Sequence, residues 1–297
     1  MRFNPNMAST VIADIQQSQQ SLQTAMQQVS TGLRVNLPSD DAAASAALVQ
    51  SQAASANIDQ YTKNADSTLS QAQSADSVLT SVVSLLNQAI TLGTEGATST
   101  TSTSAKQSIA SEVQGLLSSV VSLANTTYQG SALFAGTSSG STAFVADSSS
   151  ASGYTYTGNS GVNYVTLGSS QNIQENIPGS TLFTQSGSDV LGSLAQLSTA
   201  LSSGTAADIS SATTAISTAL NYVSSQHVTY GNTINQITAQ ETYLSQEKIT
   251  LTSQQTSLVG IDTATAAENL SQAEVNNSAV FASAAKVLQN TLLDYLK

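Results

Sequence analysis

Few residues in this chain could carry out chemistry, and one short stretch has the pattern of a nucleophile. Residues 136–140 read GTSSG and match G-x-S-x-G, the turn that presents the reactive serine of many hydrolases. Such a serine needs a strand before it, a helix after it and a histidine partner. The surrounding sequence is instead a loop rich in Ser and Gly, and the chain's single histidine, His227, falls on a predicted helical stripe. We therefore expect no enzyme activity and interpret His227 as a residue that fixes the alignment of two helices.

Two further sets of charged residues have a structural interpretation beside the chemical one. Asp40 and Asp41 could form a carboxylate pair for acid–base work, but they follow Pro38 and Ser39 at a predicted helix start. Ser39 is expected to cap that helix, with both aspartates at the positive end of its dipole. Glu241 and Lys248 lie on a predicted helical stripe, where they either fix the alignment of neighbouring helices or belong to the surface.

Composition excludes several classes of protein. The 297 residues include 7 basic and 18 acidic ones, for a net charge of −11, with no cysteine and one histidine. A Cys/His zinc site is impossible, and we expect no metal or cofactor. So few basic residues argue against a nucleic-acid partner. No run approaches the roughly 18 apolar residues that cross a bilayer, and the N-terminus lacks a signal-peptide pattern, so no membrane partner is expected.

Uncharged polar residues, mainly Ser, Thr and Gln, dominate the predicted helix surfaces. Because such surfaces do not titrate, we hypothesise that contacts built on them tolerate acid better than contacts built on ion pairs.

Apolar residues recur with a heptad period along most of the chain. The N-terminal heptad residues, which we expect to serve packing and assembly, are Ile12, Ile15, Leu22, Met26, Val29 and Leu33. A second frame runs from Ile58 to Ala89, a third from Ile109 to Leu123, and the longest from Ile209 to Leu258. A last stripe includes Phe281, Leu288, Leu292 and Tyr295. Sustained heptads predict long helices wrapped on one another, and hence a mainly α protein.

Helix length predicts the shape. A helix from Ile209 to Leu258 would extend about 75 Å at 1.5 Å per residue, whereas a globule of this chain length is only about 50 Å across. We therefore expect an elongated rod of long coiled-coil helices, with N- and C-terminal helices side by side. Between them, residues 130–185 are rich in Gly and Ser and contain runs that alternate apolar and polar residues, which predicts a small β-rich insert.

Four segments, in order, resemble the bacterial flagellin superfamily. Residues 29–43 (VSTGLRVNLPSDDAA) are similar to its N-terminal signature, and residues 123–137 (LANTTYQGSALFAGT) resemble the branch that forms the hook–filament junction, hook-associated protein 3. Residues 154–161 with 177–183, and residues 292–296, look like the short β insert and the usual ending of that branch. The residues that carry the signature are Gly32, Arg34, Pro38, Ser39, Asp40, Asp41, Asn125, Gly130, Phe134 and Gly136.

The resemblance implies a structural role outside the cell, in the flagellum. It divides the chain into terminal tube-forming helices (1–35 and 273–297), a helical rod (36–129 and 186–272) and a projecting insert (130–185). It implies export through the flagellar type III apparatus without a cleaved signal, and an export chaperone that holds the C-terminal helix. The other implied partners are further copies in a ring, a neighbouring hook-associated protein and flagellin. The alternatives are a flagellin itself or, more distantly, another secreted helical adhesin or translocation protein.

Overall fold

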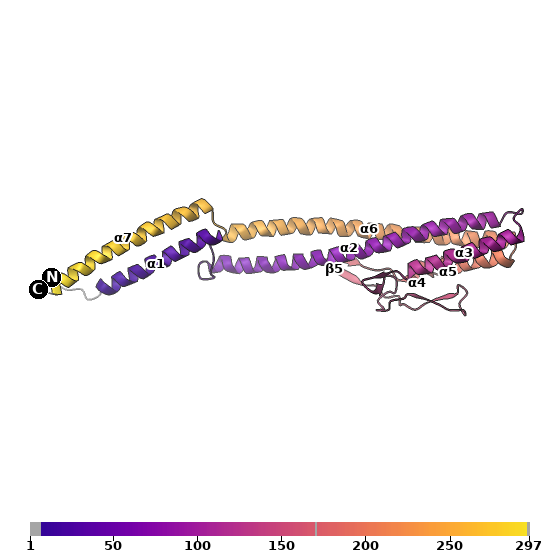
Figure 1. Ribbon diagram of the computed structural model, residues 1–297, viewed down its shortest axis with the longest axis horizontal. Coiled ribbons are helices and arrows are strands. Elements are labelled where there is room, and N and C mark those ends of the chain that lie inside the picture. Colours follow the sequence, from indigo (N-terminus) through magenta and orange to yellow (C-terminus); the bar gives the residue numbers. More distant parts are fainter. Residues whose placement is uncertain (1–6, 170, 296–297) are drawn as a thin grey trace. The chain divides into compact units, whose positions relative to one another are not determined.

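The computed structural model describes residues 7–169 and 171–295, with the side chains of residues 9–169 and 171–286. Seven helices fall in this part of the chain: α1 (Met7–Thr31), α2 (Ala42–Gly96), α3 (Thr103–Ala124), α4 (Gly179–Phe183), α5 (Val190–Ser203), α6 (Ala206–Val259) and α7 (Thr263–Tyr295) (Figure 1). The prediction of a mainly α protein with long helices and a small β-rich insert is confirmed.

The strands form three antiparallel pairs between α3 and α4. They are β1 (Thr127–Tyr128) with β2 (Ser131–Ala132), β3 (Phe144–Ala146) with β4 (Tyr154–Tyr156), and β5 (Tyr164–Gly168) with β6 (Gln171–Gln174). Each pair is a two-stranded ribbon, which is marginal by itself in water. The strands must therefore gain their stability by packing on the helices beside them.

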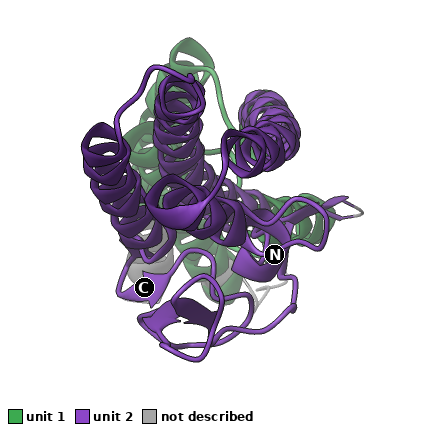
Figure 2. Ribbon diagram, turned by 90° about the vertical axis from the view of Figure 1, so that its right-hand side faces the viewer, with its two compact units in different colours: residues 1–57, 246–297 green, residues 58–245 purple. Residues whose placement is uncertain are grey.

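The chain divides into two compact units, residues 1–57 with 246–297 and residues 58–245 (Figure 2). α2 and α6 each contribute to both units. The sequence analysis divided the chain into three parts: terminal helices, a rod and an insert. That division is finer than these two units and stays a prediction.

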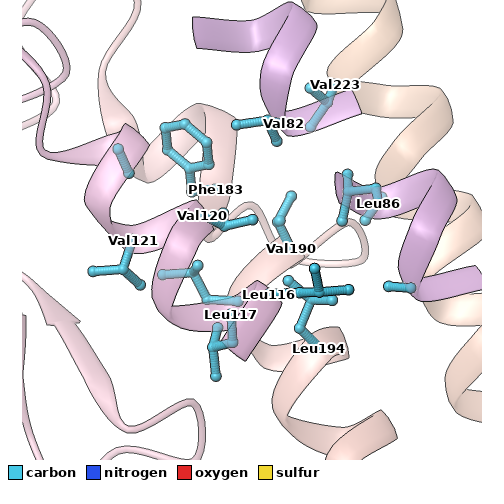
Figure 3. Close-up of a cluster of buried hydrophobic side chains, with 14 of the residues drawn as sticks. Val82, Leu86, Leu116, Leu117, Val120, Val121, Phe183, Val190, Leu194 and Val223 are labelled. Atoms are coloured by element: carbon cyan, nitrogen blue, oxygen red, sulfur yellow. The ribbon is translucent and has the colours of Figure 1, made fainter. Parts of the chain in front are cut away.

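The larger unit, residues 58–245, contains the main hydrophobic core. The heptads predicted for α2 and α6 are its centre: every a and d residue from Ala65 to Ala89 is buried, as is each seventh residue from Ile209 to Leu244. α3 and α5 pack against each other and complete the core. Figure 3 shows Leu116 and Val120 of α3 facing Val190 and Leu194 of α5.

Two glycines lie close to the end of α2, which continues through Gly93 and ends at Gly96. A Cβ on Gly93 would lie 2.3 Å from Thr213 Oγ1, and one on Gly96 would lie 2.2 Å from a Leu201 methyl. These glycines therefore let α2 approach its neighbours closely.

α2 is the only described helix that is long and apolar enough to cross a membrane. Its most apolar 18-residue window has a mean hydropathy of 1.2, and 39% of that window is buried. Since its alanines and leucines fill the seam with α6, the same composition is that of an alanine-rich core helix.

The joint between helices, the insert anchor and the exposed terminal faces

No catalytic arrangement forms at the residues that could have supplied one. Residues 136–140 lie in the loop between β2 and β3, so the strand–turn–helix context of a nucleophile elbow is missing. His227 Nε2 lies 2.8 Å from Asp76 Oδ1 and 3.4 Å from Thr80 Oγ1, both on α2. His227 therefore joins α6 to α2. Among the described residues, no three His, Cys, Asp or Glu side chains are grouped so that they could hold a metal ion.

The first signature segment forms the joint between α1 and α2. Gly32 ends α1 in the left-handed conformation (φ +69°), and its N–H donates to Gln28 O (2.9 Å). Arg34 Nη2 then donates to Asp41 Oδ2 (3.1 Å) and to Leu258 O (3.0 Å). The Arg34 N–H donates to Val259 O (2.7 Å). The segment thus ties the α1–α2 loop to the end of α6.

Two details of this joint correct the expectations from sequence. The cap of α2 is Asp41, whose Oδ1 accepts from the Ala44 N–H (2.9 Å), and not Ser39, which is exposed. Asp40 is engaged elsewhere, because its Oδ2 accepts from the N–H groups of Asn36 and Leu37. Pro38 is exposed in the turn. The Ala44 N–H, and then the Arg34 side chain, hold the pKa of Asp41 below its ordinary value.

Asn125 anchors the β insert to the end of α3. Its Oδ1 accepts from the N–H groups of Ala143 and Phe144 (2.8 Å each), and its Nδ2 donates to Phe144 O (2.8 Å). The two acceptor bonds satisfy backbone groups of residues that are almost completely buried. The Asn125 side chain thus forms three hydrogen bonds to backbone groups, in place of bonds that a neighbouring strand would otherwise supply.

The other signature residues of this segment lie in the aromatic core and in the turns of the insert. Phe134 is fully buried and packs edge to face on Phe183, with ring centroids 5.4 Å apart. Gly136 has φ +74°, and a Cβ there would lie 2.1 Å from Asn159 O. Gly130, with φ +84°, lies in the turn between β1 and β2.

Tyr230 is a connection that sequence reasoning assigned only to packing. Its ring is buried in the heptad stripe of α6, and its hydroxyl accepts from the Ile177 N–H (3.1 Å) just before α4. Burial raises the pKa of Tyr230 to about 12. In the sequence, the one sign of this polar contact is that this position of the apolar stripe is a tyrosine, whose hydroxyl can form a hydrogen bond.

The β5–β6 ribbon packs across α2 and α6 in the larger unit. Leu167 and Ile173 form a buried cluster with Ala65 and Ile237. Asn64 Nδ2 and Gln240 Nε2 donate to the carbonyls of Thr166 and Leu167. The ribbon is therefore fixed to both long helices by apolar contact and by hydrogen bonds from helix side chains to its carbonyls.

α1 and α7 lie side by side in the smaller unit (Figure 1). The residues of α1 in this contact follow a heptad pattern: half-buried Ile15, Ser18 and Leu22 share a stripe with buried Ala25. Ser18 Oγ also donates to Asn277 Oδ1 of α7 (3.2 Å). Its α7 side includes buried alanines at 266, 273 and 284. A groove of about 1050 Å³ runs along the pair.

Four apolar side chains on α1 or directly after it are exposed. Ile12 is 57% exposed, Met26 52%, Val29 42% and Leu33 37%. On α7, Phe281 is 45% exposed, while the side chains of Leu288, Leu292 and Tyr295 lie outside the described residues. Both helices therefore present apolar side chains that the described part of the chain leaves exposed, as a surface for assembly does.

Comparisons with known proteins agree with the resemblance. Residues 3–139 match the family model of the bacterial flagellin N-terminal helical region. No curated protein sequence matches the chain. Among solved structures, a flagellar hook-associated protein from Vibrio parahaemolyticus aligns with a TM-score of 0.67 at 21% identity, over 74% of this chain and 99% of the other.

Two further structures have the same fold. Hook-associated protein 3 from Legionella pneumophila aligns with a TM-score of 0.64 at 13% identity, over 70% of this chain and 98% of the other. FlgL from Bacillus cereus aligns with a TM-score of 0.60 at 23% identity, over 70% of this chain and 99% of the other. Residues 3–139 therefore match a flagellin N-terminal helical region, and the chain has the fold of flagellar hook-associated proteins.

Proposed function

We propose that the chain is a structural protein of the bacterial flagellum that joins hook to filament and serves as the template for flagellin polymerisation. The observation that carries the proposal is the fold, which aligns with nearly the whole length of hook-associated proteins from several bacteria. The flagellin N-terminal region in residues 3–139 and the lack of any catalytic arrangement at Ser138 and His227 support a structural role over an enzymatic one.

The proposed partners follow from the exposed terminal faces. Copies of the chain would form a ring through the exposed apolar side chains of Ile12, Met26, Val29 and Leu33, with a second hook-associated protein on one side and flagellin on the other. Export would pass through the flagellar type III apparatus without a cleaved signal. A chaperone would hold α7 at Phe281, Leu288, Leu292 and Tyr295 before assembly.

Deletion of the gene tests the proposal against its alternative, a filament subunit. We expect bare hooks in electron micrographs and flagellin released into the medium. Bare hooks without flagellin in the medium would assign the chain to the filament itself. Intact filaments would contradict both roles.

A pair of variants tests the assembly face in the same strain. Ile12→Ser combined with Met26→Ser removes two exposed apolar side chains, so the monomer should keep its stability but should not restore filaments. Val145→Ser, on exposed strand β3, is the matched control and should restore them. Restoration by the double variant would remove the α1 stripe from the proposed interface.

A further inference from the structure

The helices of the smaller unit are all interrupted at the joint. α1 ends at Thr31 and α6 ends at Val259, so the chain continues through two linkers, residues 32–41 and 260–262, before α2 and α7 begin. No described helix therefore runs through the joint. Hinges in proteins are commonly a few residues in loops or at the ends of elements, which absorb the change in backbone angles while the packed helices stay intact.

The two linkers pair with each other over a short distance. The Arg34 N–H donates to Val259 O (2.7 Å). The Ile261 N–H donates to Gly32 O (3.1 Å), so the two segments form a minimal antiparallel bridge. Because each linker is bonded to the other, a change in the direction of α1 must be accompanied by a change in the direction of α7.

Arg34 is the basic residue of this joint. It is the only Lys or Arg within residues 3–62, and residues 249–285 contain none. Its Nη2 donates to Leu258 O (3.0 Å) and to Asp41 Oδ2 (3.1 Å). The guanidinium therefore lies at the negative end of the α6 dipole and also binds the carboxylate that caps α2. One side chain thus holds the end of α6 to the start of α2.

The other three helix ends at the joint are capped by residues next to them in sequence. Gly32 closes α1, Asp41 caps α2, and Asp262 Oδ2 accepts from the Thr265 N–H (3.2 Å) at the start of α7. The end of α6 differs, because its last two carbonyls accept from the side chain and the N–H of Arg34. Loss of the Arg34 contacts therefore frees α6 from the linker and leaves the caps of the other helices in place.

We propose that the two linkers form a single hinge and that Arg34 is its latch. When the latch opens, α1 and α7 turn together relative to the start of α2 and the end of α6. The side chains of Arg34 and Asp41 are 47% and 30% exposed. An ion pair this exposed contributes little to stability and weakens with salt, which suits a contact that opens and closes reversibly. The hinge does not depend on the flagellar role, so either proposal can fail without the other.

Distances between two spin labels test the latch in the full-length chain. Because the chain has no cysteine, Gln16→Cys on α1 and Gln50→Cys on α2 place labels at two exposed sites only. Pulsed electron paramagnetic resonance should give one narrow distance distribution for this pair. Arg34→Gln should increase the population at other distances by about two- to fivefold, the range for the loss of an exposed ion pair. At about 1 M NaCl the unsubstituted latch should approach the variant.

Matched variants separate the latch from other effects. Asp41→Asn keeps an oxygen for the Ala44 N–H but loses the charge that Arg34 binds, so it should broaden the distribution in the same direction. Lys63→Gln removes an equal charge from an exposed site on α2 and should leave the distribution unchanged. Labels at Gln16→Cys and at Ser271→Cys, an exposed site on α7, should keep one distance in every variant.

Three results would overturn the proposal. A distribution that Arg34→Gln leaves unchanged, or one that Lys63→Gln broadens equally, would show that Arg34 is not a latch. Broadening of the label pair on α1 and α7 in Arg34→Gln would show that the two helices separate or unfold and do not turn as one body.

Discussion

Among the polar residues that hold the β insert, we expect Asn125 to cause the largest loss of stability when it is replaced. Asn125→Ala removes the Oδ1 that accepts from the Ala143 and Phe144 N–H groups, whose residues are 0% and 2% exposed. A buried donor left without a partner costs about 1–3 kcal/mol, and the bond to Phe144 O is lost as well. We therefore expect the free energy of unfolding to fall by about 3 kcal/mol.

The assay is urea unfolding followed by circular dichroism, with hydrogen exchange at residues 143 and 144 as a local probe. Asn125→Asp keeps the acceptor for both N–H groups but sets a second acceptor oxygen against Phe144 O, so it should protect the amides of residues 143 and 144 better than Asn125→Ala does without restoring wild-type stability. Asn235→Ala, on the exposed surface of α6, should change stability by less than about 0.5 kcal/mol. A loss below about 1 kcal/mol for Asn125→Ala, with unchanged exchange at 143 and 144, would refute the anchor.

Two further predictions concern the other signature residues. Gly136→Ala should destabilise the chain by at least about 2 kcal/mol, because its Cβ would meet Asn159 O at a left-handed φ. Gly153→Ala, at φ +75° with nothing within 4 Å, should cost only about 1 kcal/mol; equal losses in thermal unfolding would contradict the clash. Asp41 has a lowered pKa, so its contribution is complete above the ordinary aspartate pKa and is lost as the pH falls through the lowered one. In an NMR titration Arg34→Ala should raise that pKa only part of the way, since the Ala44 N–H remains; an unchanged pKa would exclude the Arg34 contact.

The long helices were predictable because their heptads continue over many turns. The stripes from Ile58 to Ala89 and from Ile209 to Leu244 contain few polar residues, and the core forms along them. The aromatic and glycine positions of the insert came from the resemblance, and the structure supplies their physical reason in the close packing around Phe134 and Gly136.

The sequence does not show which of two neighbouring residues caps a helix or packs against the next one. Ser39 and Asp41 are both good helix caps, and only the fold shows that Asp41 reaches the Ala44 N–H. On α1 the small side chain of Ala25 is buried, whereas its neighbour Met26, which the heptad pattern predicted to pack, is exposed. Hydrogen bonds between backbone and side chain, such as the one that the Ile177 N–H donates to the Tyr230 hydroxyl, have no sequence signal at the backbone end.

The position of the protein on intact flagella tests the central claim most directly. Cells that carry an epitope-tagged copy with normal motility would be labelled with gold-conjugated antibody and examined by electron microscopy. A junction protein predicts one cluster of gold where each hook meets its filament. Gold spread along the filament would show a filament subunit, and flagella without gold would contradict a structural role in the flagellum.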